Sequence, residues 1–114
     1  MADPAEVDEL FRALADSRRR VALSCLASYQ DLTLPDLADE LAEIEYDQPL
    51  TEIDPETVTE LYFDLYHSHV PCLVAADLVE YDQAQDYLAI TDRGDAAQSE
   101  LVEQARALTA PEQR

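Results

Sequence analysis

The spacing of apolar residues changes sharply near residue 78, and this change constrains the fold more than any other sequence feature. Before that point apolar residues recur three and four positions apart, which is the spacing of one face of an α-helix. From 78 to 91 they alternate with polar residues and include Val, Tyr, Ile and Thr, as in short strands. Helical spacing then returns. The pattern predicts a mainly α domain with a small β-hairpin, which is an α+β fold.

Capping residues place the expected helices. Asp3, Thr33 and Asp54 each stand just before a Pro of the first turn, an arrangement that favours helix initiation, and Asp16 is a further cap. A helix is expected after each of these four residues, with a loop at 46–53 before the fourth helix, which covers 54–76. Two strands then follow at 78–82 and 86–91, joined by a turn at 83–85, and a last helix covers about 92–108. The 114 residues are expected to form one domain, 1–114, with a core at about 6–94 and a frayed tail after 108.

The charge balance is strongly acidic. There are 26 acidic residues against 7 basic ones, all of them Arg, and the net charge is −19. Such a chain repels itself unless salt screens it, and at roughly 1 M salt the Debye length falls to about 3 Å. We interpret the balance as adaptation to a salt-saturated, halophilic cytoplasm. The alternatives are an acidic protein of an ordinary cell and a protein that binds basic partners. Under salt adaptation, an acidic surface does not exclude DNA as a partner.

The expected location is cytoplasmic. No apolar run approaches the roughly 18 residues of a membrane span, and the start lacks the basic and apolar regions of a signal peptide. The two cysteines, Cys25 and Cys72, do not make a disulfide framework.

Three segments resemble a known family. LVAADLVEYDQAQDYLAITDRGDAA (residues 73–97) resembles the end of the recognition helix and the wing of archaeal and bacterial winged-helix transcription regulators. LFRALADSRRRVALSCL (10–26) is similar to the opening of the arsenic-repressor-like group. Together with LYHSHVPCL (65–73), these segments resemble a small haloarchaeal winged-helix domain family of unknown function, over about residues 6–94. The resemblance implies a winged helix-turn-helix, with flanking first and last helices for homodimerisation, that binds double-stranded DNA and regulates transcription.

The helix expected to read DNA has unusual chemistry for that task. Between 54 and 76 there are acids but no Arg, Lys, Asn or Gln, and the expected turn of the wing has no basic residue. Phosphate contacts normally come from Arg and Lys, and adenine is normally read by Asn or Gln. These features favour the alternative function, which is a winged-helix protein–protein adaptor without DNA binding.

The candidate DNA-binding residues lie on two parts of the chain. On the outer face of the 54–76 helix, we expect Thr59, His67 and Ser68 to be polar readers and Phe63 to contact a thymine methyl group. The competing interpretation is an acidic face that is solvated or covered by a partner. The remaining candidates are Arg18, Arg19 and Arg93, which we expect to contact phosphate. The competing interpretation is that these arginines form ion pairs with nearby acidic side chains, as surface arginines more often do.

The His/His/Cys group in LYHSHVPCL has the residue types of a metal or redox site. His67 and His69 point about 200° apart around a helix, so they cannot coordinate one metal ion together. His69 and Cys72 are suitably spaced but lack a third ligand nearby, so no metal site is expected. We expect His69 to be a core residue hydrogen-bonded to a neighbouring helix or to backbone, with redox switching by the cysteines the less favoured alternative. Pro71 is expected to loosen the helix between His67 and Pro71.

No enzymatic motif stands out. The chain lacks a Ser/His/Asp arrangement, a Gly-rich phosphate loop and a metal-water motif. We therefore expect no catalytic residue, no cofactor and no small-molecule ligand.

Overall fold

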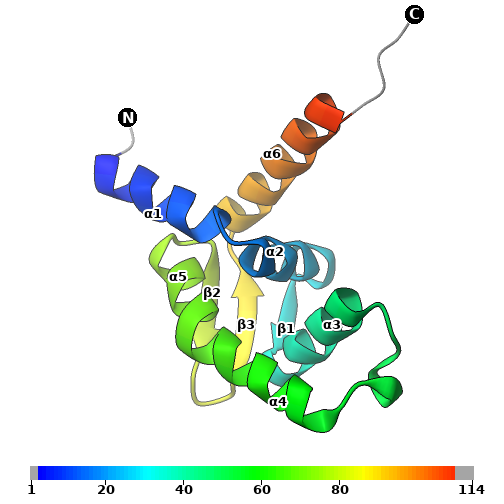
Figure 1. The fold of residues 1–114 in the computed structure, drawn as a ribbon. Coiled ribbons are helices and arrows are strands. Elements are labelled where there is room, and N and C mark those ends of the chain that lie inside the picture. Colours follow the sequence, from blue (N-terminus) through cyan, green and yellow to red (C-terminus); the bar gives the residue numbers. More distant parts are fainter. Residues whose placement is uncertain (1–2, 110–114) are drawn as a thin grey trace, which may run out of the picture.

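The computed structural model describes residues 3–109, which form six α-helices, two short turns of other helix types and three strands (Figure 1). In chain order they are α1 Pro4–Leu14, α2 Ser17–Tyr29, β1 Asp31–Thr33, α3 Leu34–Tyr46, the 3-10 turn η1 Leu50–Glu52, α4 Pro55–Asp64, the π-helical turn η2 Leu65–His69, α5 Val70–Ala75, β2 Val79–Asp82, β3 Tyr87–Ile90 and α6 Asp92–Thr109. The prediction of a mainly helical α+β fold is confirmed.

The three strands form one antiparallel sheet in the order β1-β3-β2. Leu88, at the centre of β3, pairs with Leu32 of β1 on one side and Tyr81 of β2 on the other. The prediction of a hairpin alone was incomplete, because β1 was missed. Three residues are too few for an alternating pattern, and Thr33 at the end of β1 is also the cap of α3, where its hydroxyl accepts from the Asp36 amide at 3.2 Å.

The expected caps form at each of the first four helix starts. The Asp3, Asp16 and Asp54 carboxylates accept hydrogen bonds from amides of the first turn of α1, α2 and α4. The hairpin turn lacks Gly, and Asp86 instead supplies the left-handed backbone conformation, with a φ of 53°. Asp82 supports the same turn by accepting from the Ala84 amide at 3.0 Å. Aspartate tolerates this conformation better than most residues, which explains how the turn forms without Gly.

The 54–76 segment is continuous but is not a uniform α-helix. The Val70 amide donates to the Leu65 carbonyl, which makes one π-helical turn between α4 and α5. The expected loosening before Pro71 is therefore present, but it lies over Leu65–His69. The extra residue in the turn rotates α5 relative to α4, and Val70, which regular helical spacing would place on the same face as Phe63, is only 2% exposed.

Leucines of α2, α3, α5 and the sheet form the centre of the core. The largest fully buried side chains are Leu23, Leu26, Leu34, Leu37, Leu41, Leu65, Leu73, Leu78, Val79 and Leu88. Ile44 follows the helical spacing of Leu37 and Leu41 but is exposed, because it lies in the last turn of α3, beyond the packed region.

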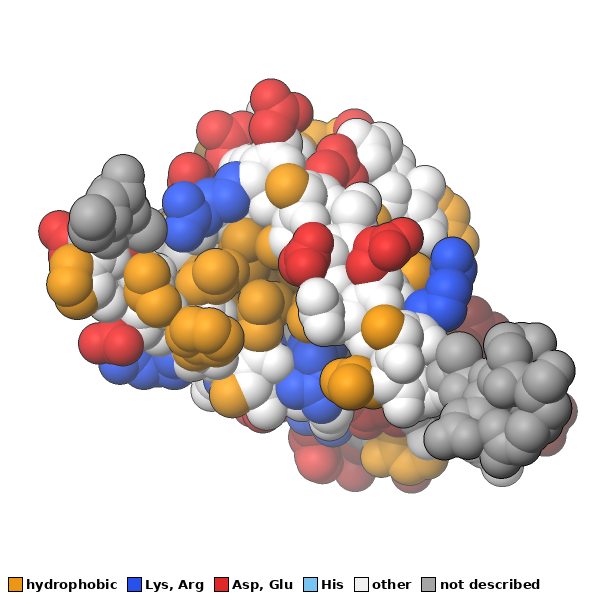
Figure 2. All heavy atoms as spheres, turned by 90° about the horizontal axis from the view of Figure 1, so that it is seen from above, with side chains coloured by type: hydrophobic (Ala, Val, Ile, Leu, Met, Phe, Trp, Pro, Cys, Tyr) orange, Lys and Arg blue, Asp and Glu red, His pale blue; other side chains and the backbone are white. Residues whose placement is uncertain are grey.

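The first and last helices extend away from the body (Figure 1). α6 packs on α2 and β3 through its first half, and beyond Leu101 all its described residues are exposed. Leu10 and Leu14 of α1 pack against the core, whereas Phe11 on the same helix is 68% exposed. Figure 2 shows hydrophobic side chains gathered on this side of the molecule. Residues 110–114, expected to fray, lie outside the described part of the chain.

Candidate functional site

The outer face of α4 and η2 is the most distinctive exposed surface. Thr59, Phe63 and His67 are all exposed on it, and the rings of Phe63 and His67 stack with centroids 6.1 Å apart. Tyr66 meets His67 edge-on at 4.9 Å and contacts Tyr81 of β2 in the same way at 6.3 Å. An aromatic surface therefore runs from α4 to the hairpin. Sequence spacing predicted its first part, but the link to Tyr81 needed the tertiary fold.

Ser68 lies apart from this surface. It is exposed, but it lines a hollow with Asp16, Arg18 and His69, whereas His67 lines another with Tyr81 and Gln83 of the hairpin. The structure thus brings Thr59, Phe63 and His67 together and places Ser68 on the flank that faces α2.

Arg18 is held by two carboxylates. Its guanidinium makes paired bonds of 2.6 and 2.8 Å to Glu45 and a third bond of 2.6 Å to Asp64. The bonds to Glu45 first, and to Asp64 after them, raise the pKa of Arg18 despite partial burial. This arginine ties α2 to the end of α3 and to α4, and its donors point at protein rather than at an external phosphate.

Arg19 is also engaged within the domain. It donates to the carbonyl oxygens of Ala13 at 2.9 Å and Arg12 at 2.8 Å, where α1 ends, and to Nδ1 of His69 at 3.2 Å. Carbonyls at a helix end lack partners within the helix. Arg19 supplies such a partner to Ala13 and adds a bond to the Arg12 carbonyl, which also accepts from the Ala15 amide at 3.4 Å. Arg19 therefore holds α1 and α2 in place relative to η2.

His69 completes this network from the core. Its side chain is 8% exposed, and its Nε2 lies 2.7 Å from Oδ2 of Asp64. Because Arg19 can only donate, Nδ1 of His69 must accept and Nε2 carries the proton that is donated to Asp64. The prediction of a core histidine bonded to a neighbouring helix is confirmed. Burial tends to raise the pKa of Asp64, but the bonds from Arg18 and His69 outweigh it, so that pKa is lowered.

A second polar contact fixes the hairpin to α4. The Asp86 carboxylate accepts from the Tyr62 hydroxyl at 2.5 Å and from the Tyr81 hydroxyl through its other oxygen. The bond to Asp86 is the main reason that the pKa of Tyr62 rises to about 12. Both tyrosines are therefore neutral donors near neutral pH. The contact was not predicted, although an Asp at the end of a turn without Gly was a usable signal.

Arg93 is distant in the fold from these contacts. It is exposed in the first turn of α6, which follows β3 at the end opposite to the hairpin turn (Figure 1). It therefore does not join the surface formed by α4 and the hairpin.

The cysteines and acids form no evident metal centre. Within residues 3–109, no group of three or more His, Cys, Asp or Glu side chains is arranged to hold an ion. Cys25 and Cys72 are both free thiols. Burial, with a smaller contribution from Glu40, raises the pKa of Cys25 to about 11, which makes its thiolate scarce near neutral pH.

Among residues 3–109, no helix has the length and apolar character needed to cross a membrane.

Comparison with known proteins gives one family match. The model of a family described as a domain of unknown function, DUF7344, matches residues 11–89. This range contains the α4 surface, the hairpin turn and the Arg18–Asp64–His69 network, and it excludes most of α1 and all of α6. No curated protein and no solved structure matches the chain.

Proposed function

This chain belongs to DUF7344, a family of domains of unknown function, and we propose that it is a salt-adapted winged helix-turn-helix protein that binds double-stranded DNA as a homodimer and regulates transcription. The observation that carries the proposal is the position of the exposed α4 face beside the hairpin. A helix with an uncovered outer face suits the major groove, which is wide enough to admit one.

The order of the elements supports the winged-helix part of the proposal. α2 and α3 flank β1, α4 follows η1, and the β2–β3 hairpin comes next, with β1 added to its β3 edge. α3 and α4 serve as the helix-turn-helix pair, and η1 lies within the long connection between them. The turn at 83–86 serves as the wing, and Tyr62 holds it to α4 through Asp86.

In this mechanism α4 enters the groove with Thr59, Phe63 and His67 leading. Thr59 and His67 offer hydrogen-bonding groups to base edges, and Phe63 offers an apolar surface to a thymine methyl group. At molar salt the gain from releasing counterions is small. Binding then depends on shape, apolar contacts and hydrogen bonds. The negative charge of the helix opposes these contacts less at molar salt than it would at low salt.

The arginines expected to contact phosphate take a different part in this proposal. Arg18 and Arg19 are positioning residues, because their donors hold α1, α3 and α4 around α2. Either arginine could reach phosphate only by giving up bonds inside the domain. Arg93 lies at the opposite end of β3 from the hairpin turn, away from the α4 surface, so the proposal assigns it no DNA contact.

The dimer is proposed to form through α1 and the outer half of α6. Phe11, Val102 and Leu108 are exposed large apolar residues there, with Leu108 82% exposed. A second copy that covered these side chains would remove apolar surface from water and orient two α4 helices for successive half-sites. Sedimentation in molar KCl tests this: the wild type is expected to be dimeric and Phe11→Ser monomeric. A monomeric wild type contradicts it.

Chromatin immunoprecipitation from the source cell, at its own internal salt, tests the function. Discrete enriched sites near promoters are expected. A uniform background across the genome, with the protein present at normal levels, contradicts DNA-directed regulation.

The protein–protein adaptor is the second candidate. Its specific support is that Arg18 and Arg19 are both bonded internally while α4 carries Glu56, Glu60 and Asp64 with no basic residue. This function predicts that a protein partner is crosslinked to the wild type in cells and that Phe63→Ser abolishes the crosslink. Enriched DNA sites without such a partner would exclude it.

A further inference from the structure

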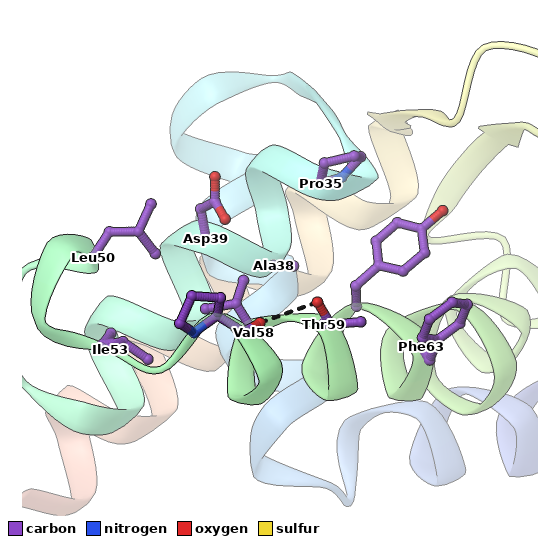
Figure 3. A pocket seen from close by; sticks show the side chains of 10 residues that line it. Pro35, Ala38, Asp39, Leu50, Ile53, Val58, Thr59 and Phe63 are labelled. Atoms are coloured by element: carbon purple, nitrogen blue, oxygen red, sulfur yellow. Dashed lines mark hydrogen bonds between the residues drawn. The ribbon is translucent and has the colours of Figure 1, made fainter.

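A cleft lies between α3, η1 and α4, on the side of α4 next to its outer face (Figure 3). Its volume is about 460 Å³, within the roughly 300–1,000 Å³ typical of small-molecule sites. The walls are mostly apolar: Pro35, Ala38, Leu50, Ile53, Pro55, Val58, Tyr62 and Phe63, with Asp39 and Thr59 as polar members.

The two polar side chains of the cleft differ in whether they already have a hydrogen-bond partner. The Thr59 hydroxyl already donates to the Pro55 carbonyl at 3.0 Å. Asp39 is half-buried, and its side chain makes no hydrogen bond or ion pair within residues 3–109. Burial first, and then the neighbouring acids Asp36, Glu43 and Glu40, raise the pKa of Asp39. The positive charge of a cation placed beside this carboxylate would offset both effects.

Aromatic rings complete the opposite end of the cleft. Tyr62 and Phe63 line it, and their rings meet edge to face with centroids 5.2 Å apart. Phe63 is half exposed, so its ring remains open to a ligand. At this end the rings offer an apolar surface on which the aromatic body of a ligand can pack.

We propose that this cleft binds a small organic cation with an apolar body, such as an arylalkylammonium ion. The apolar body would extend along Val58 to the rings of Tyr62 and Phe63, and the charged head would lie at Asp39, next to η1 (Figure 3). A second copy of this chain is a poor occupant of the cleft, because it has 26 acidic residues against 7 basic ones and would bring more acid to Asp39. The dimer contact proposed above is different, since exposed apolar residues of α1 and α6 make it.

Occupancy would also affect the proposed DNA surface. Thr59 and Phe63 belong both to the cleft and to the outer face of α4. A bound cation would fix the Phe63 ring and add positive charge beside an acidic helix, so it would change DNA binding. This regulatory consequence rests on the proposed function, whereas ligand binding itself does not.

The test uses the full chain and a set of probes with one apolar body. These are 4-phenylbutylammonium, neutral 4-phenylbutanol and anionic 4-phenylbutyrate, titrated in molar KCl while backbone amide resonances are followed by NMR. We expect the cation to shift resonances of η1 and of residues 36–39 and 58–63, and to bind about fivefold or more tightly than the alcohol. This ratio corresponds to the roughly 1 kcal/mol of a partly exposed ion pair.

Asp39→Asn is the decisive variant, and Glu103→Gln on exposed α6 is the matched control. The preference for the cation should disappear in Asp39→Asn and persist in Glu103→Gln. Equal affinity for all three probes, shifts confined to other surfaces, or a preference that survives Asp39→Asn would overturn the proposal. So would cleft resonances that shift with protein concentration alone, because a second copy would then be the occupant. None of these outcomes depends on DNA, so a failure here is distinguishable from a failure of the proposed function.

Discussion

Gly94→Ala tests how α6 is seated on the sheet. Gly94 is buried in the first turn of α6. A Cβ at this position would lie 2.1 Å from the Leu78 carbonyl oxygen and 2.6 Å from Cγ1 of Ile90. The Ile90 side chain has some freedom to move. The Leu78 carbonyl does not, because it is backbone and accepts from the Thr91 amide at 3.1 Å. An added methyl group must therefore push α6 away from the strands.

Two opposing effects set the size of the change. Alanine favours a helix over glycine by about 1 kcal/mol. Overpacking a closely fitted site costs about 1–3 kcal/mol, and a contact with a fixed backbone oxygen belongs at the upper end of that range. The expected net loss is about 1–2 kcal/mol, which for a domain of this size lowers Tm by about 4 °C or more.

Thermal and urea unfolding followed by circular dichroism in molar KCl measures this loss. Ala96→Gly, at an exposed position of the same helix, is the matched control and should lose about 1 kcal/mol through helix propensity alone. The sign of the Gly94→Ala result is decisive. If Gly94→Ala is as stable as the wild type or more so, helix propensity dominates and the close packing of α6 on Leu78 is refuted.

Further predictions concern the contacts around α4 and the two thiols. Because the pKa of folded Asp64 is lowered below the ordinary value of 3.8, its contribution to stability is complete above about pH 5 and is lost as the pH falls through the lowered pKa. Asp64→Asn should therefore lower the free energy of unfolding by up to about 1 kcal/mol at neutral pH, a small value because the Asp64 side chain is 38% exposed. The variant should also lose less stability than the wild type as the pH falls below about 5. An equal loss in both proteins would refute this. Tyr62→Phe removes one of the two hydroxyls bonded to Asp86 and should speed hydrogen exchange of amides 83–86 severalfold at little cost in stability; unchanged exchange would show that the bond does not hold the turn. In native protein Ellman's reagent should modify Cys72 first and Cys25 only on unfolding, because Cys25 is buried and its pKa is raised; simultaneous modification would contradict this.

The helices could be predicted because their signals are local. Caps and Pro residues mark the starts near Asp3, Asp16, Thr33 and Asp54, and each cap forms in the structure. β1 depends instead on pairing with β3, which lies more than fifty residues away along the chain. The π-helical turn depends on which side chains pack against the core. Pro71 indicated that the helix would be irregular but did not specify the shift that buries Val70.

The candidate surface was predictable only in part, for the same reason. Helical spacing placed Thr59, Phe63 and His67 on one exposed face, and all three are exposed. Ser68 is adjacent in sequence to His67, but consecutive helical residues point about 100° apart, and Ser68 lines another hollow. The bonds of Arg18 to Glu45 and Asp64 span 27 and 46 residues, so only the tertiary fold could show that these charges are paired. The cleft near Asp39 likewise forms from three elements that are separate in sequence.

Selection of random-sequence duplex DNA in molar KCl is the most direct test of the claim that the outer face of α4 reads DNA. The wild type and Glu103→Gln should enrich the same motif, and the double variant Thr59→Ala, His67→Ala should lose it while keeping its fold, because both positions are exposed. If the wild type enriches no motif, or if the double variant enriches the same one, the outer face of α4 does not read DNA and the central claim is wrong.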